Sequence, residues 1–194
     1  MAKPVYAFEE ADSKKRMLLG GKGAGLSEMT RLKLPVPPGF TITTEVCNKY
    51  YDNNKKLPKD VMPAVMKNIM KMEKKTGKKW NSTKNPLLVS VRSGAAISMP
   101  GMMDTILNLG LNEKTVEGFA EQTRNPRFSW DSYRRFIQLF GKVVFGVNDE
   151  KFDHVLDSAK TKQGVSDDSK LNVESLKSIV SEYKKICETH TKRK

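Results

Sequence analysis

A glycine-rich cluster with one lysine, residues 20–25 (GGKGAG), is the first group that could do chemistry. Small residues let backbone N–H groups approach an anion, and the ammonium of Lys22 would neutralise phosphate charge. The cluster does not fit the P-loop motif, because Gly23 stands where Ser or Thr is needed and Arg16 where the first glycine would be. Nor does it fit G-x-G-x-x-G, whose last position is Leu26. Spacing alone leaves phosphate binding and a purely structural loop both open.

A second candidate is an arginine at the end of an apolar strand. Arg92 and Ser93 follow that strand, and a loop of small residues leads through Gly101 to Thr105, where the chain turns back toward another strand. A guanidinium there offers phosphate oxygens a planar fork that lysine cannot imitate. The alternative is an arginine that pairs with a carboxylate or covers a turn. Three methionines of this loop are interpreted as core filler rather than ligand contacts: Met99, Met102 and Met103.

The residue sets of common catalytic and metal sites are missing from the sequence. His154 and His190 fall in predicted helices, and neither has the partners of a catalytic triad or the i, i+4 pairing of a metal site. Cys47 and Cys187 form no C-x-x-C pair, which indicates two reduced structural thiols. The sequence therefore predicts no metal ligands, and no catalytic group beyond phosphate stabilisation by the lysine and the arginine.

The elements that would position these groups differ between the two halves of the chain. In the first half, the glycine cluster is expected to be a loop that feeds a helix over 20–34, which residues 35–39 (PVPPG) stop. Short strands are predicted at 40–43, 87–91 and 106–109, where β-branched and aliphatic residues dominate.

The second half is predicted to be helical over 113–123, 129–145, 149–160 and 173–191. Asn172 is expected to cap the last helix, and 162–171 to form a polar linker. The fold class is therefore α+β, with a boundary near residue 111. It separates an α+β subdomain at 1–111, with the phosphate loops, from a helical subdomain at 112–194.

Charge is concentrated in one segment of a chain of 194 residues with a net charge of +13. Residues 55–79 hold nine lysines against Asp60 and Glu73, and apolar residues recur among them at helical spacing. That pattern favours a solvated helix face over a nucleic-acid surface, because arginine and aromatic residues are not interleaved. No window has the roughly 18 apolar residues of a membrane span. We expect a cytoplasmic protein that binds neither nucleic acid nor membrane.

Two runs of the sequence resemble a known family. Residues 18–47 (LLGGKGAGLSEMTRLKLPVPPGFTITTEVC) and 86–112 (PLLVSVRSGAAISMPGMMDTILNLGLN) are similar to the N-terminal nucleotide-binding domain of the pyruvate, phosphate dikinases. The resemblance implies the first part of an ATP-grasp domain. It also implies that Lys22 and Arg92 hold the phosphates of ATP, and that Gly101 and Thr105 line the nucleotide site.

The resemblance further implies the family reaction, in which ATP, phosphate and pyruvate give AMP, pyrophosphate and phosphoenolpyruvate through a phosphohistidine. The Mg²⁺ ligands, the phosphohistidine domain and the pyruvate-binding barrel are expected in the remaining dikinase domains, which would be partners of this chain. We therefore expect an ATP-binding N-terminal portion that is inactive alone. The alternative is a free-standing, non-catalytic nucleotide- or phosphate-binding module.

Overall fold

The computed structural model describes residues 3–94 and 105–192, which form two compact units. The first unit comprises residues 3–78 and 92–94, and the second comprises 79–91 and 105–192. Each unit therefore consists of two separate stretches of chain. The mixture of helices and strands agrees with the α+β class, while the domain boundary near residue 111 stays a prediction.

The first unit is built on a small antiparallel pair of strands. Strand β1 (Val5–Ala7) pairs with β2 (Phe40–Ile42), with Val5 opposite Ile42 and Ala7 opposite Phe40. The outer two residues of β1 are buried and the central one is half-buried, as expected for a strand with one face on the core. Strand β2 confirms the strand expected at 40–43, whereas β1 was not predicted.

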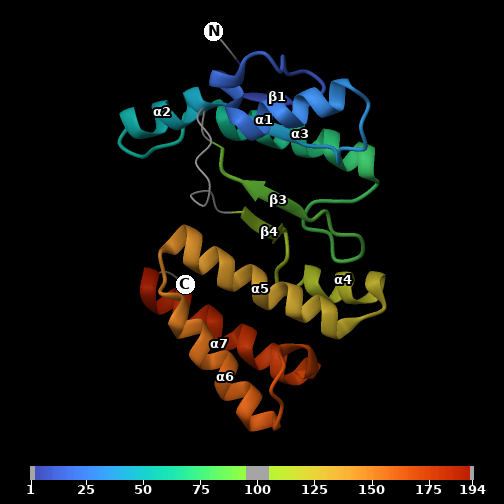
Figure 1. The fold of residues 1–194 in the computed structure, drawn as a ribbon, viewed down its shortest axis with the longest axis vertical. Helices are drawn as coiled ribbons and strands as arrows, with labels where there is room; N and C mark the ends of the chain where they lie inside the picture. The colour runs from blue at the N-terminus through green and yellow to red at the C-terminus, as the bar shows by residue number, and fades with distance from the viewer. Residues whose placement is uncertain (1–2, 95–104, 193–194) are drawn as a thin grey trace. The chain divides into compact units, whose positions relative to one another are not determined.

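Three helices complete this unit: α1 (Arg16–Arg31), α2 (Thr44–Asp52) and α3 (Val61–Thr76). Helix α1 contacts β2 and α2, and α3 contacts β1 (Figure 1). Helix α3 confirms the helical spacing of the lysine-rich segment, and it ends at Gly77, whose φ of 70° suits glycine. Helix α2 had no counterpart in the predicted elements.

The lysine face of α3 is partly neutralised rather than wholly solvated. Lys71 forms an ion pair with Glu10, and Lys75 forms one with Glu9. The hydrogen bond from Lys75 holds the pKa of Glu9 below its usual value, and that from Lys71 does the same for Glu10. The acidic turn after β1 is thus held to the basic helix.

The second unit contains four helices and a strand pair, except that Arg92, the last residue of the first of these strands, is grouped with the first unit. Strand β3 (Val89–Arg92) pairs with β4 (Thr105–Leu109), close to the predicted positions. The helices are α4 (Thr115–Thr123), α5 (Pro126–Phe145), α6 (Asp149–Gln163) and α7 (Val173–Thr191), with a short 3-10 helix at Asp168–Lys170. Helix α5 contacts β4, α4, α6 and α7 and so lies at the centre of this unit (Figure 1).

One apolar cluster holds these helices together. Phe152 of α6 and Tyr183 of α7 are fully buried, with their ring centroids 4.8 Å apart and their planes at 68°. Asn172 caps α7 as predicted, because its side chain accepts a hydrogen bond from the Ser175 N–H. The predicted polar linker is wrong at its end: Leu171 is 1% exposed and belongs to the cluster.

Candidate phosphate-binding site

The glycine cluster lies within helix α1 rather than in a loop before it. Gly20 alone departs from helical geometry, with φ 69° and ψ 165°, a region that is essentially restricted to glycine. The helix begins again directly after this residue, so Lys22 lies in a new first turn. The predicted loop was therefore wrong in extent, because one glycine suffices to break the helix and the residues after it bury a face.

Gly23 explains why the residues after Gly20 form a helix packed on β2 rather than a loop. A Cβ atom at this position would lie 2.8 Å from both Cγ2 and Oγ1 of Thr41 in β2. One turn later the hydroxyl of Ser27, which is 1% exposed, donates to the Gly23 carbonyl at 2.9 Å. This glycine therefore serves the close approach of α1 to β2.

The structure brings Lys22 to the segment that carries the arginine. The Lys22 ammonium donates to the Ser93 carbonyl oxygen at 3.0 Å, although the two residues are 71 positions apart in sequence. Ser93 directly follows Arg92, the last residue of β3. Two candidates that sequence reasoning found separately thus share one neighbourhood within the first unit. No feature of the sequence pointed to the Ser93 carbonyl as the partner.

Arg92 is exposed and is the last residue of β3. Among residues 3–94 and 105–192, nothing forms a hydrogen bond or ion pair with the Arg92 side chain. The alternative of an arginine paired with a carboxylate thus has no support within these ranges. An exposed guanidinium, and an ammonium held at the carbonyl of the next residue, can each attract an anion such as phosphate.

The other two predicted site residues are placed less fully. Thr105 is half-buried and begins β4 in the second unit. Gly101 lies outside the described residues, as do the three methionines of the same loop. The structure therefore relates Lys22 to the Arg92 segment and says nothing of the geometry at Gly101.

The histidines and cysteines take no part in this site. His154 lies in α6, and His190 lies in α7 with Nε2 2.9 Å from the Phe145 carbonyl oxygen. Cys47 and Cys187 are free thiols, and burial raises the pKa of Cys187. The described part of the chain contains no group of three His, Cys, Asp or Glu residues that could hold a metal ion. None of its helices is long and apolar enough to cross a membrane.

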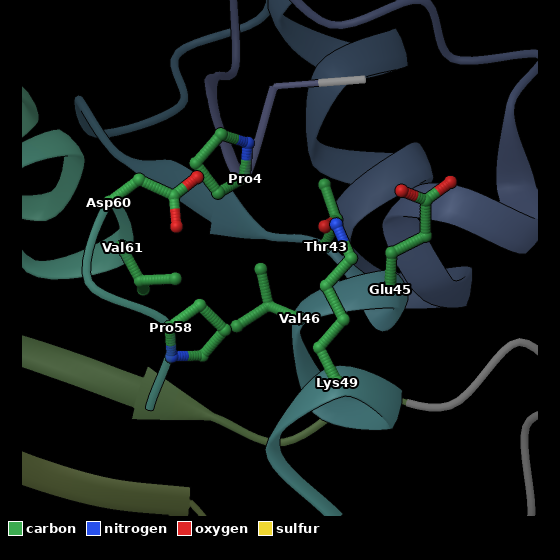
Figure 2. A pocket seen from close by; sticks show the side chains of 8 residues that line it. All are labelled: Pro4, Thr43, Glu45, Val46, Lys49, Pro58, Asp60 and Val61. Carbon is green, nitrogen blue, oxygen red and sulfur yellow. The ribbon is translucent and has the colours of Figure 1, made fainter. Parts of the chain in front are cut away.

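Neither of two hollows in the described residues is lined by these cations. In the first unit, a cavity of about 20 Å³ lies where the chain enters β1, α2 and α3; Figure 2 shows its lining by Pro4, Thr43, Glu45, Val46, Lys49, Pro58, Asp60 and Val61. In the second unit, a hollow of about 260 Å³ is lined by Leu107, Asn108, Ser132, Arg135, Phe136, Gln138 and Leu139. The first is far below the roughly 300–1,000 Å³ of small-molecule sites, and neither includes Lys22 or Arg92.

Comparison with known proteins identifies the family. The model of the pyruvate phosphate dikinase AMP/ATP-binding domain matches residues 16–59 and 53–192. The chain belongs to this family. Its match includes Lys22, Arg92, Gly101 and Thr105, so all four candidate residues lie inside the family domain.

Several pyruvate, phosphate dikinases are similar to the chain over almost all of its length. The protein of Entamoeba histolytica is 53% identical over 189 residues, which is 97% of this chain and 21% of that relative. The protein of Clostridium symbiosum is 50% identical over 96% of this chain, and that of Giardia intestinalis is 50% identical over 94%. The chain thus spans about a fifth of the length of these dikinases, 21% in each case.

Proposed function

We propose that this chain is the N-terminal ATP-binding portion of a pyruvate, phosphate dikinase. The observation that carries the proposal is the 3.0 Å contact from the Lys22 ammonium to the Ser93 carbonyl, which gathers a lysine and an exposed arginine from distant segments. Lys22, in a helix that restarts after Gly20, contacts the residue that follows Arg92, and these two cationic residue types suit an anionic ligand. The match to the dikinase AMP/ATP-binding domain supports ATP as that ligand.

Within this proposal the four candidate residues have separate roles. Lys22 and Arg92 neutralise the phosphates of ATP and stabilise charge that develops during transfer. Gly101 and Thr105 line the nucleotide. Phosphoryl transfer depends mainly on positioning and electrostatic stabilisation, which cations and backbone amides supply. The architecture proposed is the first part of an ATP-grasp domain with a helical subdomain.

The complete reaction belongs in this proposal to a longer dikinase. ATP, phosphate and pyruvate would give AMP, pyrophosphate and phosphoenolpyruvate, with the phosphohistidine and the pyruvate site in the remaining domains. Mg²⁺ would be held by residues of those domains, as the resemblance to the dikinases implies. We propose a cytoplasmic location, which suits two free thiols.

Calorimetric titration of Mg-ATP into the purified chain tests ATP binding. Hydrogen bonds to charged groups contribute about 1.5–3 kcal/mol, so Lys22→Ala and Arg92→Ala should each weaken affinity about 10- to 100-fold. Lys67→Ala, which removes an exposed lysine of α3, is the matched control and should leave the affinity unchanged. Equal affinities in all four proteins would contradict the assigned roles.

The alternative is a free-standing, non-catalytic module that binds a nucleotide or phosphate. AMP release that requires pyruvate and phosphate should be absent from the chain alone and should appear only with the remaining dikinase domains. Full ATP affinity of the isolated chain, with no gain in activity when those domains are added, would favour the module instead.

A further inference from the structure

Three glycines of helix α1 have different surroundings. Gly20 adopts a backbone conformation that other residues rarely reach. Gly23 has helical geometry but lies too close to Thr41 for a Cβ atom. Gly25, half a turn further on, is exposed, and a Cβ there would meet nothing within 4 Å. Of the two glycines with helical geometry, close packing thus explains Gly23 and not Gly25.

The contact at Gly23 fixes how closely α1 lies against β2. Both γ atoms of Thr41 would be 2.8 Å from an added Cβ, and the Leu19 side chain would be 3.4 Å away. Real Cβ atoms essentially never come within 3.0 Å of a neighbour, so a methyl group at this position must displace the helix or rearrange the threonine. Because Thr41 is the central residue of β2, paired with Tyr6 of β1, the strand offers little freedom to move.

Lys22 immediately precedes this contact, and its ammonium reaches the Ser93 carbonyl at 3.0 Å. A hydrogen bond weakens when its partners shift by a few tenths of an ångström beyond the usual range. We infer that the contact between Gly23 and Thr41 sets the position of the Lys22 ammonium, and that Thr41 is a positioning residue for the candidate site. The consequence for ATP binding rests on the proposed function, but the inference itself concerns the position of Lys22.

The rate at which acetic anhydride acetylates Lys22, followed by mass spectrometry, tests this inference without ATP. The neutral amine attacks the anhydride and acetate leaves, so a lysine whose ammonium donates to a carbonyl must first give up that hydrogen bond and a proton. Gly23→Ala should therefore raise the rate at Lys22 several-fold. Lys67, which is exposed on α3, is an internal reference whose rate should not change. Gly25→Ala is the matched control in the same helix, and should leave the rate at Lys22 as it is.

A compensating substitution separates positioning from general damage. Thr41→Ala removes both γ atoms and makes room for the new methyl group, so Gly23→Ala combined with Thr41→Ala should return the Lys22 rate to that of the unaltered chain. Thr41→Ala alone, which introduces no clash, should give a smaller increase, because α1 loses its fixed distance from β2. This single variant supplies the test if Gly23→Ala does not fold.

An unchanged Lys22 rate in both Gly23→Ala and Thr41→Ala would overturn the inference, and so would an increase that the double variant fails to reverse. Titration of the same variants with Mg-ATP separates the two proposals. Altered labelling without any change in ATP affinity would contradict the proposed function of Lys22 and leave the positioning inference standing.

Discussion

The two units bury apolar side chains in different ways. In the second unit, α5, α6 and α7 enclose one continuous cluster in which Phe152, Leu176 and Tyr183 are fully buried. The first unit buries smaller side chains such as Val5 and Ala24, and leaves several large ones exposed, among them Met17, Met62, Met66 and Met70. We infer that the second unit has the more stable core. The first unit positions its candidate site through a few close contacts, such as that of Gly23 with Thr41.

The largest expected effect is the loss of a ring from the cluster of the second unit. Phe152 is 0% exposed, and Phe→Ala changes in cores cost about 3–5 kcal/mol because they remove apolar contacts and leave a cavity. Phe152→Ala should lower the free energy of unfolding by that amount in a urea titration. Val144→Ala in α5, at a side chain that is 49% exposed, is the control and should cost far less. Similar losses in the two variants would contradict a continuous core.

Replacing a helical glycine by alanine should change stability in opposite directions in the two units. A Cβ at Gly141 of α5 would lie 2.6 Å from the Phe152 ring and 2.9 Å from the Cys187 sulfur, so Gly141→Ala should destabilise by about 1–3 kcal/mol through overpacking. Gly25→Ala in α1 meets open space and should stabilise by about 0.5–1 kcal/mol through helix propensity. Thermal unfolding of both variants measures the two changes in stability. Destabilisation by Gly25→Ala would contradict the expected difference between the two units.

The smallest expected effect is an acid sensitivity of the first unit. Lys75 and Lys71 lower the pKa values of Glu9 and Glu10 in the folded chain, below a reference value of 4.5. A carboxylate whose pKa is lower in the folded than in the unfolded state stabilises the folded state at pH values above the unfolded pKa. This stabilisation is lost as the pH falls below about 4.5. Glu9→Gln combined with Glu10→Gln should flatten this part of the stability profile between pH 5 and pH 3, measured by urea titration at each pH. An unaltered slope would show that these ion pairs contribute nothing.

The helices of the second unit could be predicted because their periodic apolar residues and their caps are local signals. Asn172, for example, caps α7 through a residue only three positions away. Strand β1 could not be found in this way, because its three residues become a strand by pairing with β2, more than thirty positions later. The burial of Leu171 could not be predicted because its sequence neighbours are polar. It depends on contacts distant in sequence, such as the 3.0 Å hydrogen bond that Arg127 donates to its carbonyl oxygen.

Within the candidate site, the residue types showed which groups to consider, but the sequence did not show which groups would contact one another. Glycine and lysine in one cluster left an anion site and a purely structural loop both open. The sequence could not distinguish glycines needed for conformation from those needed for close packing. Gly20 has a positive φ that suits glycine, whereas Gly23 is helical and lies too close to Thr41 for a Cβ atom. The contact of Lys22 with Ser93 depends on two segments meeting through the fold, which no local pattern encodes.

The interleaving of the two units along the chain matters for anyone who shortens this protein. A fragment that ends at residue 78 keeps most of the first unit by length, yet it carries Lys22 without the Ser93 carbonyl and without Arg92. A fragment that begins at residue 105 keeps the long helices but loses the strand that pairs with β4. A single cut therefore separates segments that contact one another in the folded chain. A useful minimal fragment must retain residues 79–94, which contribute to both units.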